Sequence, residues 1–322
     1  MTLLSALILL SGILAGWTLG ANDAANSMGT AVGAKVRSIR EAVIIVGVFS
    51  LAGALLFGHS VIKTIGRGIV PLDQIDPHQS TIIALTAMLA SGIWLFAATY
   101  LKLPVSTTHS IVGAVAGAGL AAGNVPIYWA QLVEIVMAWV LTPLGSAVLG
   151  YVLYQLLRIF VLKRFNLPDR IWVLPLTLSG MYMAFSWGAN DVANATGHMV
   201  GVGLVPPFQA AFLGGIAIVV GIATWCYRVM ETVGTRITNL LPAMAFIAEV
   251  AAALNVHLYT ILGLPVSTTH SVVGAIFGVG LVLGRRAVDV RTVRDIVLAW
   301  AATPAAAGVV ALVLYTILSR IF

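Results

Sequence analysis

The chain has 322 residues, of which 60% are hydrophobic and 9% are charged, and its mean hydropathy is +1.03. Soluble domains carry about 25% charged residues, so this composition excludes a soluble globular protein and indicates an integral membrane protein. The net charge of +6 arises from 17 Lys and Arg spread along the chain, which favours basic loops beside a membrane over a nucleic-acid-binding surface. We therefore expect the lipid bilayer as a partner and no nucleic acid. The one cysteine, Cys226, lies in an apolar run and is expected to be a small buried side chain.

Hydrophobic segments follow one another along the chain at lengths suited to a bilayer, which a helix of about 20 residues spans. The first resembles a signal peptide, but it has no basic residues before its apolar run, and we read it as a retained membrane segment. In the first half the segments are 2–35, 41–60, 80–101, 105–122 and 127–157, and in the second half 171–203, 207–228, 242–262, 266–284 and 296–321. The first segment of each half is expected to be interrupted by a polar motif.

The two halves are copies of one plan. Gly20-Ala-Asn-Asp23 returns in the second half as Gly188-Ala-Asn-Asp191, and Pro104-Val-Ser-Thr-Thr-His-Ser110 returns as Pro265-Val-Ser-Thr-Thr-His-Ser271, in the same order. Such self-similarity at a nearly constant spacing is the mark of an internal repeat. We therefore expect a first repeat at 1–157, a short cytoplasmic linker at 158–170 and a second repeat at 171–322.

An odd number of passes in each repeat places the two copies in the membrane with opposite orientation. With the N-terminus outside, basic residues divide between the two sides as the positive-inside rule requires. The cytoplasmic side then holds Lys35, Arg37, Arg40, Lys102, Arg158, Lys163, Arg164, Arg170, Arg228, Arg236, Arg285, Arg286, Arg291 and Arg294, and the outside holds Lys63, Arg67 and Arg320. Segments 80–101 and 105–122, with their counterparts 242–262 and 266–284, are either full spans or re-entrant hairpins, and neither choice changes this orientation.

The repeated motif Gly20-Ala-Asn-Asp-Ala-Ala-Asn26 places a carboxylate and two carboxamides at membrane depth, where polar groups are costly and usually functional. Gly, Asn and Asp disfavour a helix interior, so we expect a helix that ends near Gly20 and a second that begins near Asp23. The freed N–H groups would favour an anion, and the Asp23 carboxylate with unwound carbonyls would favour a cation. A purely structural cap is the competing interpretation, and duplication of the motif argues against it.

The second motif reads as a helix start, with Pro104 in the first turn and Ser or Thr at the cap. Three hydroxyls beside a helix N-terminus form a site for an anion. Such hydroxyls also serve only to bond neighbouring helices in many membrane proteins. Two starts from each repeat are expected to converge near the midplane, as in inverted-repeat transporters with broken helices.

Other polar groups are assigned lesser roles. His109 and His270 either relay a proton or, as we prefer, are neutral side chains bonded to a neighbouring helix. Glu249 has no acidic counterpart in the first half and is a secondary candidate for ion handling. The spacings Gly113-x-x-x-Gly117 and Gly274-x-x-x-Gly278 indicate close helix packing.

The doubled Gly-Ala-Asn-Asp and Pro-Val-Ser-Thr-Thr-His motifs resemble the signature of the inorganic phosphate transporter (PiT) family, over residues 20–304. The resemblance implies an inverted-repeat carrier that moves phosphate with Na⁺ or H⁺. It also implies which residues bind each ion. Phosphate would be bound by Asn22, Asn26, Ser106, Thr107, Thr108, Asn190, Asn194, Ser267, Thr268 and Thr269. The cation would be bound by Asp23, Asn22, Asp191 and Asn190. After Asn194 the second copy departs from the first, since Ala195-Thr-Gly-His198 replaces Ser27-Met-Gly-Thr30.

We therefore predict an all-α integral membrane protein of two inverted repeats, about five passes each, in the plasma membrane with both termini outside. It is expected to be a transporter and not an enzyme, importing phosphate by alternating access with Na⁺ in preference to H⁺, without a resident cofactor. Sulfate or another oxyanion is an alternative substrate, and a homo-oligomer is compatible with the sequence. An intramembrane hydrolase using Ser106 or Ser267 with His109 or His270, and an open channel, are the competing function classes.

Overall fold

The computed structural model describes residues 3–33, 36–100, 105–165, 167–226, 241–282, 284 and 290–322. All regular structure in these ranges is helical, as expected. The helices are α1 (Leu3–Asn22), α2 (Ala25–Gly33), α3 (Ile39–Lys63) with the π-helix η1 (Thr64–Gly68), α4 (Pro77–Tyr100), α5 (Thr107–Ala122), α6 (Trp129–Leu157) with the π-helix η2 (Arg158–Leu162), the 3₁₀ turn η3 (Asp169–Trp172), α7 (Val173–Gly201), α8 (Pro207–Thr224), α10 (Pro242–Ile261), α11 (Thr268–Leu281) and α12 (Val290–Ile321). Lys35, Lys102, Pro104, Arg228, Arg236, Arg285 and Arg286, on which sequence expectations rest, lie outside the described residues.

Seven helices of the described chain are long and apolar enough to cross a membrane. They contain α1, α3, α4, α6, α8, α10 and α12. Two more, α5 with 16 residues and α11 with 14, are apolar but short. At 1.5 Å per residue they reach about 24 Å and about 21 Å, less than the bilayer core of about 30 Å. The protein is thus an all-helical, multi-pass membrane protein with two apolar helices that are shorter than the bilayer core.

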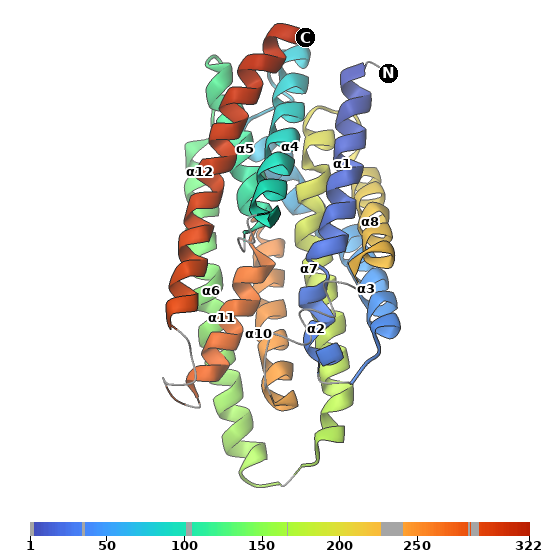
Figure 1. Cartoon of the computed structure of the whole chain (residues 1–322), viewed down its shortest axis with the longest axis vertical. Coiled ribbons are helices and arrows are strands. Elements are labelled where there is room, and N and C mark those ends of the chain that lie inside the picture. Colours follow the sequence, from blue (N-terminus) through green and yellow to red (C-terminus); the bar gives the residue numbers. More distant parts are fainter. Residues whose placement is uncertain are drawn as a thin grey trace.

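Those two short helices belong to two hairpins that point at each other. In Figure 1, α4 descends to the middle of the molecule and α5 returns upward, whereas α10 rises to the middle and α11 returns downward. The first helices also run in opposite directions, α1 downward from the N-terminus and α7 upward from the linker. Both chain termini lie at the same end, which we call the terminal end, and the segment joining the halves lies at the other, the linker end (Figure 1).

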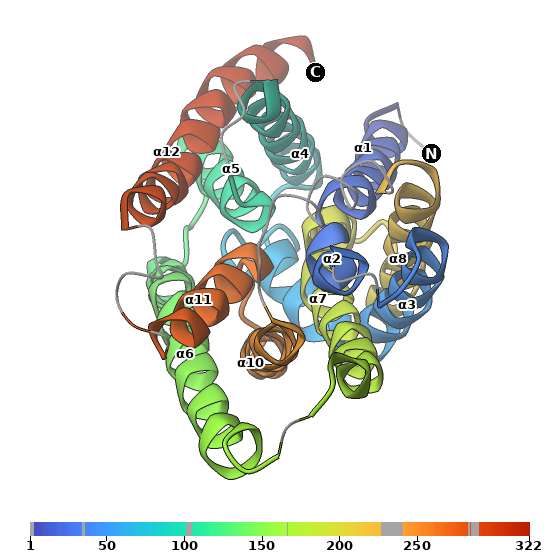
Figure 2. The same cartoon turned by 60° about the horizontal axis from the view of Figure 1, so that its bottom comes forward.

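The two halves interlock. Viewed with the linker end forward, α6 and α12 lie on one side and α1, α3 and α8 on the other, with α2, α5 and α11 between them (Figure 2). Each short helix packs on the last helix of the opposite half through glycine. A Cβ on Gly113 of α5 would stand 2.2 Å from the Pro304 carbonyl oxygen of α12, and one on Gly274 of α11 would stand 2.2 Å from that of Pro143 in α6. The predicted packing role of these small residues is confirmed.

The repeated polar motif breaks the helix in the first half only. There α1 ends at Asn22 and α2 begins at Ala25, close to the expected interruption. The expected break in the second half is wrong, because α7 runs unbroken from Val173 through Asn190 and Asp191 to Gly201. The side chains of Asn190 and Asp191 are bonded to the hairpin tips, so these polar residues need no unwound backbone to satisfy them.

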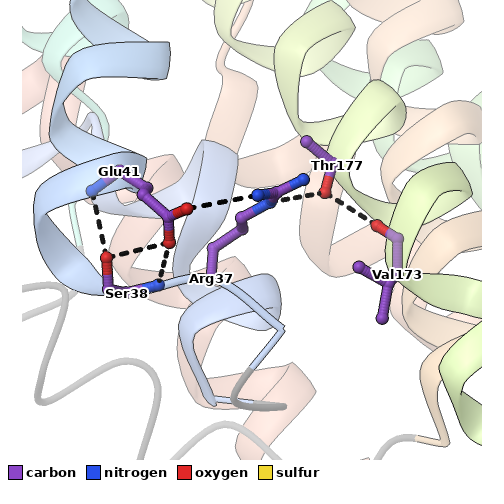
Figure 3. Close-up of polar contacts among 5 residues, drawn as sticks. All are labelled: Arg37, Ser38, Glu41, Val173 and Thr177. Atoms are coloured by element: carbon purple, nitrogen blue, oxygen red, sulfur yellow. Dashed lines mark hydrogen bonds and ion pairs between the residues drawn. The ribbon is translucent and has the colours of Figure 1, made fainter.

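Two arginines of the first half hold the ends of α7. At the linker end, Arg37 Nε donates to Thr177 Oγ1 at 2.9 Å, and Arg37 Nη1 lies 3.2 Å from a Glu41 carboxylate oxygen (Figure 3). Glu41 and Ser38 cap the start of α3 reciprocally, which fixes the carboxylate that receives Arg37 (Figure 3). At the terminal end, Arg67 Nη2 donates to the Val200 carbonyl at 3.2 Å. Arginines of the first half therefore bond to α7, in the second half, near both of its ends.

Candidate functional site

The site is built where the two hairpin tips meet the two copies of the polar motif. Ser106 and Ser267 are the N-caps of α5 and α11, and each hydroxyl accepts from the backbone N–H of the histidine that follows in its motif, at 3.3 Å. The expected helix starts with Ser at the cap are confirmed. Pro265 precedes its cap by two positions instead of lying in the first turn of the helix. Because the serines are used as caps, the threonines that follow them are the side chains that face the motifs.

Asp191 is the centre of the polar network. Thr108 Oγ1 of α5 donates to its Oδ1 at 3.2 Å, and Thr268 Oγ1 of α11 donates to its Oδ2 at 3.2 Å. Asn194 Nδ2 donates to the same Oδ1 at 2.9 Å and to Thr108 Oγ1 at 3.0 Å. All four side chains are buried. One carboxylate thus receives a hydroxyl from each hairpin, and bonds to a charged acceptor are the stronger kind.

The first copy of the motif also bonds to the hairpin tips, but through fewer hydrogen bonds than the second copy. Asp23 lies in the break between α1 and α2, half-buried, and accepts from Thr107 Oγ1 at 3.2 Å. Asn26 Nδ2 reaches Thr269 Oγ1 of α11 at 3.3 Å. Since Thr107 and Thr108 are consecutive, one turn of α5 holds the carboxylates of both motifs. Asn22, which ends α1, is exposed and has no side-chain hydrogen bond among those of the described residues.

Asn190 is engaged in positioning the second hairpin. Its Nδ2 donates to Thr260 Oγ1 at 3.0 Å and to the Leu264 carbonyl at 3.1 Å, and its Oδ1 accepts from the Val266 N–H at 3.0 Å. The whole carboxamide is therefore used on the end of α10 and the segment between α10 and α11. Thr260 was not identified from the sequence, because it lies in a helix with no motif around it and meets Asn190 only in space.

The two motif histidines form a buried aromatic cluster behind the site. His109 stacks on Trp139 at 3.8 Å between ring centroids, His270 stacks on Trp300 at 3.4 Å, and the two imidazoles meet edge to face at 4.4 Å. His109 Nδ1 lies 3.1 Å from the Trp300 carbonyl oxygen. The preferred expectation of a histidine bonded to a neighbouring helix is met for His109. His270 makes its ring contacts by stacking.

This arrangement argues against the hydrolase hypothesis. Ser106 Oγ accepts from the backbone N–H of His109, while the His109 ring is directed at Trp300. Ser267 is likewise bonded to the backbone of His270. A serine nucleophile needs the ring of its base within hydrogen-bond reach, and neither pair provides that contact.

A further difference between the halves lies at the linker end. Ser179 of α7 donates to the buried carboxylate of Glu249 in α10, and the matching residues of the first half are Ser11 and Met88, whose hydroxyl and sulfur lie 3.5 Å apart. The absence of an acidic counterpart to Glu249 was evident from the sequence. Its buried partner was not.

Comparison with known proteins decides the family. The model of the family described as PHO4, phosphate transporter family, matches residues 19–179 and 168–311, which together contain both copies of both motifs. The chain belongs to the phosphate transporter family. The resemblance seen in the motifs is confirmed, and so is the expectation of a membrane transporter rather than an enzyme.

Individual relatives agree along the whole length of the chain. A Pyrococcus horikoshii protein named "Putative phosphate permease PH0640" is 35% identical, with 97% of each chain covered. The Arabidopsis thaliana protein named "Inorganic phosphate transporter 2-1, chloroplastic" is 30% identical over 99% of this chain and 73% of its own length. A solved structure titled "The sodium-dependent phosphate transporter" superimposes with a TM-score of 0.90 and 31% identity, covering 100% of both chains.

Proposed function

We propose that this phosphate transporter family member imports inorganic phosphate with Na⁺ by alternating access across the plasma membrane. The observation that carries the proposal is the single carboxylate of Asp191 held by one hydroxyl from each hairpin, Thr108 and Thr268. A ligand bound at this junction touches both halves at once, so its binding and release are coupled to their relative movement. The names of the relatives, phosphate permeases and a sodium-dependent phosphate transporter, favour the same substrate and coupling ion.

Phosphate would bind where the starts of α5 and α11 converge. Their N-termini present backbone N–H groups and the positive ends of the helix dipoles, which attract an oxyanion. Thr107, Thr108, Thr268 and Thr269 supply hydroxyls, Ser106 and Ser267 organise the caps, and Asn22, Asn26 and Asn194 supply carboxamides. Asn190 contributes chiefly by fixing the second tip.

Sodium would bind at the carboxylates. Asp23 and Asp191, with the carboxamide oxygens of Asn22 and Asn190 and nearby carbonyls, are hard oxygen ligands of the kind that Na⁺ and other hard cations prefer. Two negative carboxylates and an oxyanion in one buried site repel one another, and cations bound between them offset that repulsion. This is the physical reason for coupling: the anion is stabilised only when the cations are present.

We propose an inverted arrangement of two repeats, 1–157 and 171–322, joined at 158–170 on the cytoplasmic side, with both termini outside. The opposite directions of α1 and α7 and of the two hairpins support it, as does the sharing of one end by both termini (Figure 1). The α4–α5 and α10–α11 hairpins would then be re-entrant, each entering and leaving on its own side.

The two copies of the motif differ in accessibility, which supports an alternating mechanism. Asn22 is exposed and Asp23 half-buried, whereas Asn190 and Asp191 are each 1% exposed. This difference favours a state in which the first motif is open to a path from one side while the second is closed off. After the hairpins rearrange, the second motif would be open to the other side and the first would be closed off.

The test is radiolabelled phosphate and sulfate uptake by the purified protein in liposomes, with Na⁺ and pH gradients imposed separately. We expect an inward Na⁺ gradient to accumulate phosphate above its external concentration and a Na⁺ ionophore to collapse that accumulation. Accumulation driven only by the pH gradient would show that H⁺, not Na⁺, is the coupling ion. Preferential uptake of sulfate would show that sulfate is the substrate. Strictly downhill flux would indicate a channel.

A further inference from the structure

Asp191, Asn194 and His198 share one face of α7, at positions i, i+3 and i+7. The remaining faces of this stretch are occupied by other helices. Thr196 lies against Gly214 of α8, Gly197 against Gly66 of η1, and Met199 against Gly12 of α1. His198 therefore continues the face of the site by one turn beyond Asn194, toward the terminal end, in the direction in which α7 runs (Figure 1).

Buried polar atoms on this face lack partners among the described residues. Asn194 uses its Nδ2 on Thr108 and Asp191, but its Oδ1 is buried without a hydrogen bond. His198 is 0% exposed, and both of its ring nitrogens are unpartnered. Leaving a buried donor or acceptor unsatisfied costs about 1–3 kcal/mol, so such groups in a folded protein call for an explanation. Three of them within one helical turn, adjoining a proposed ligand site, point to a ligand that supplies the missing bonds.

The chemistry of these atoms selects the kind of ligand. A neutral imidazole has one N–H donor and one acceptor nitrogen, and an amide oxygen is an acceptor. A ligand that pairs with both kinds of atom must offer at least one hydrogen and one acceptor oxygen. Hydrogen phosphate and dihydrogen phosphate carry both a P–OH group and free oxygens, whereas sulfate at neutral pH has no hydrogen to donate. Na⁺ prefers oxygen ligands to imidazole, so it would leave His198 unsatisfied.

We propose that Asn194 Oδ1 and the His198 ring form a subsite that accepts the P–OH group of protonated phosphate and so selects phosphate over sulfate. The inference deepens the proposed function and rests on it. A site built around hydrogen-bonding groups rejects an analogue that leaves them unpaired, by a larger factor than any apolar pocket achieves. The subsite exists only in the second half, because Thr30 stands at the position equivalent to His198.

The experiment measures selectivity in liposomes, as the inhibition constant of sulfate divided by the KM of phosphate under an imposed Na⁺ gradient. For His198→Met, which fills the space with no donor and only a weak thioether acceptor, we expect this ratio to fall about 10-fold through a higher phosphate KM. His198→Gln, which keeps one donor group and one acceptor, is expected to retain the ratio within about 3-fold. Thr196→Val is the matched control, since among the described residues its buried hydroxyl bonds only the Val192 carbonyl of its own helix, and it faces α8.

A second arm needs no variant. Arsenate, which is protonated as phosphate is, should compete with phosphate in the wild-type protein, and the fluorophosphate dianion, which has no hydrogen, should not. An unchanged ratio in His198→Met, or strong competition by fluorophosphate, would overturn the inference. Absence of Na⁺-driven phosphate uptake in the wild type would instead overturn the proposed function, so the two failures are distinguishable. A structural role for His198 would lower the maximal rate and the melting temperature together and leave the selectivity ratio unchanged, which would also contradict the proposal.

Discussion

Thr108 and Thr268 donate hydrogen bonds to opposite oxygens of one carboxylate, that of Asp191, at 3.2 Å each. They come from the two copies of one motif, in which Thr108 is the second threonine of its copy and Thr268 the first of the other. The tips of the two hairpins are therefore joined through a side chain of a third helix. A change at this carboxylate therefore alters contacts with both hairpins.

The first prediction concerns that carboxylate. Asp191→Asn keeps the size of the side chain but removes its charge, and we expect Na⁺-driven phosphate uptake to fall by at least 100-fold because the cation loses its principal ligand. Asp23→Asn should likewise abolish the dependence on Na⁺. The initial rate of radiolabelled uptake in liposomes measures both. Asp169→Asn, at an exposed position in η3, is the control and should transport normally. Near-normal uptake by Asp191→Asn would remove this residue from the mechanism.

The second prediction tests the junction as a unit. Thr108→Val and Thr268→Val each delete one hydroxyl bonded to a charged acceptor, a contact worth about 1.5–3 kcal/mol, so each should raise the half-saturating Na⁺ concentration by roughly 10- to 150-fold. Because both threonines act on one carboxylate, the effects in the double variant should not add. Thr86→Val is a suitable control, since its buried hydroxyl in α4 has no hydrogen-bond partner in the described part of the chain. Strict additivity would show that the hairpins act on Asp191 independently.

The third prediction concerns packing between the halves. Gly113→Ala would bring a Cβ to 2.2 Å from the Pro304 carbonyl oxygen, where backbone must move, and overpacking of this kind costs about 1–3 kcal/mol. We expect a lower melting temperature in detergent. Gly92→Ala, on an exposed face of α4 with nothing within 4 Å, should be neutral or stabilising because Ala favours a helix over Gly. Equal melting temperatures for the two variants would contradict the tight crossing of α5 and α12.

The fourth prediction isolates the contact between Arg37 and Thr177 at the linker end. Thr177→Val removes the acceptor of the arginine Nε, and we expect a loss of about 0.5–1.5 kcal/mol in stability. Thr303→Val is closely matched, because both threonines are buried and bond a carbonyl one turn earlier in their own helix, and within the described part of the chain only Thr177 receives an arginine. Thermal unfolding of both variants measures the difference. If the arginine contributes nothing, the two substitutions will lower the melting temperature equally.

Local patterns in the sequence were sufficient to predict much of the molecule. The lengths of the hydrophobic segments predicted the helices. The duplicated motifs predicted that Asp23 and Asp191 lie close to the two helix N-termini that carry the Ser-Thr-Thr sequence. The serine caps at Ser106 and Ser267 followed from the preference of short hydroxyl side chains for helix N-termini. These features depend on residues close together in the chain, or on repetition.

Only the tertiary structure decided what those residues do to one another. The break expected at Asp191 does not occur, because Thr108 and Thr268 arrive from other helices and satisfy the carboxylate inside an unbroken α7. Likewise, Thr260 and His198 carry no motif, and their meaning comes from the helices that surround them. The sequence by itself determined the membrane class, the family resemblance and the candidate residues of the site. The different environments of the two motif copies depend on contacts between segments far apart in the chain, and no local sequence pattern predicts such contacts.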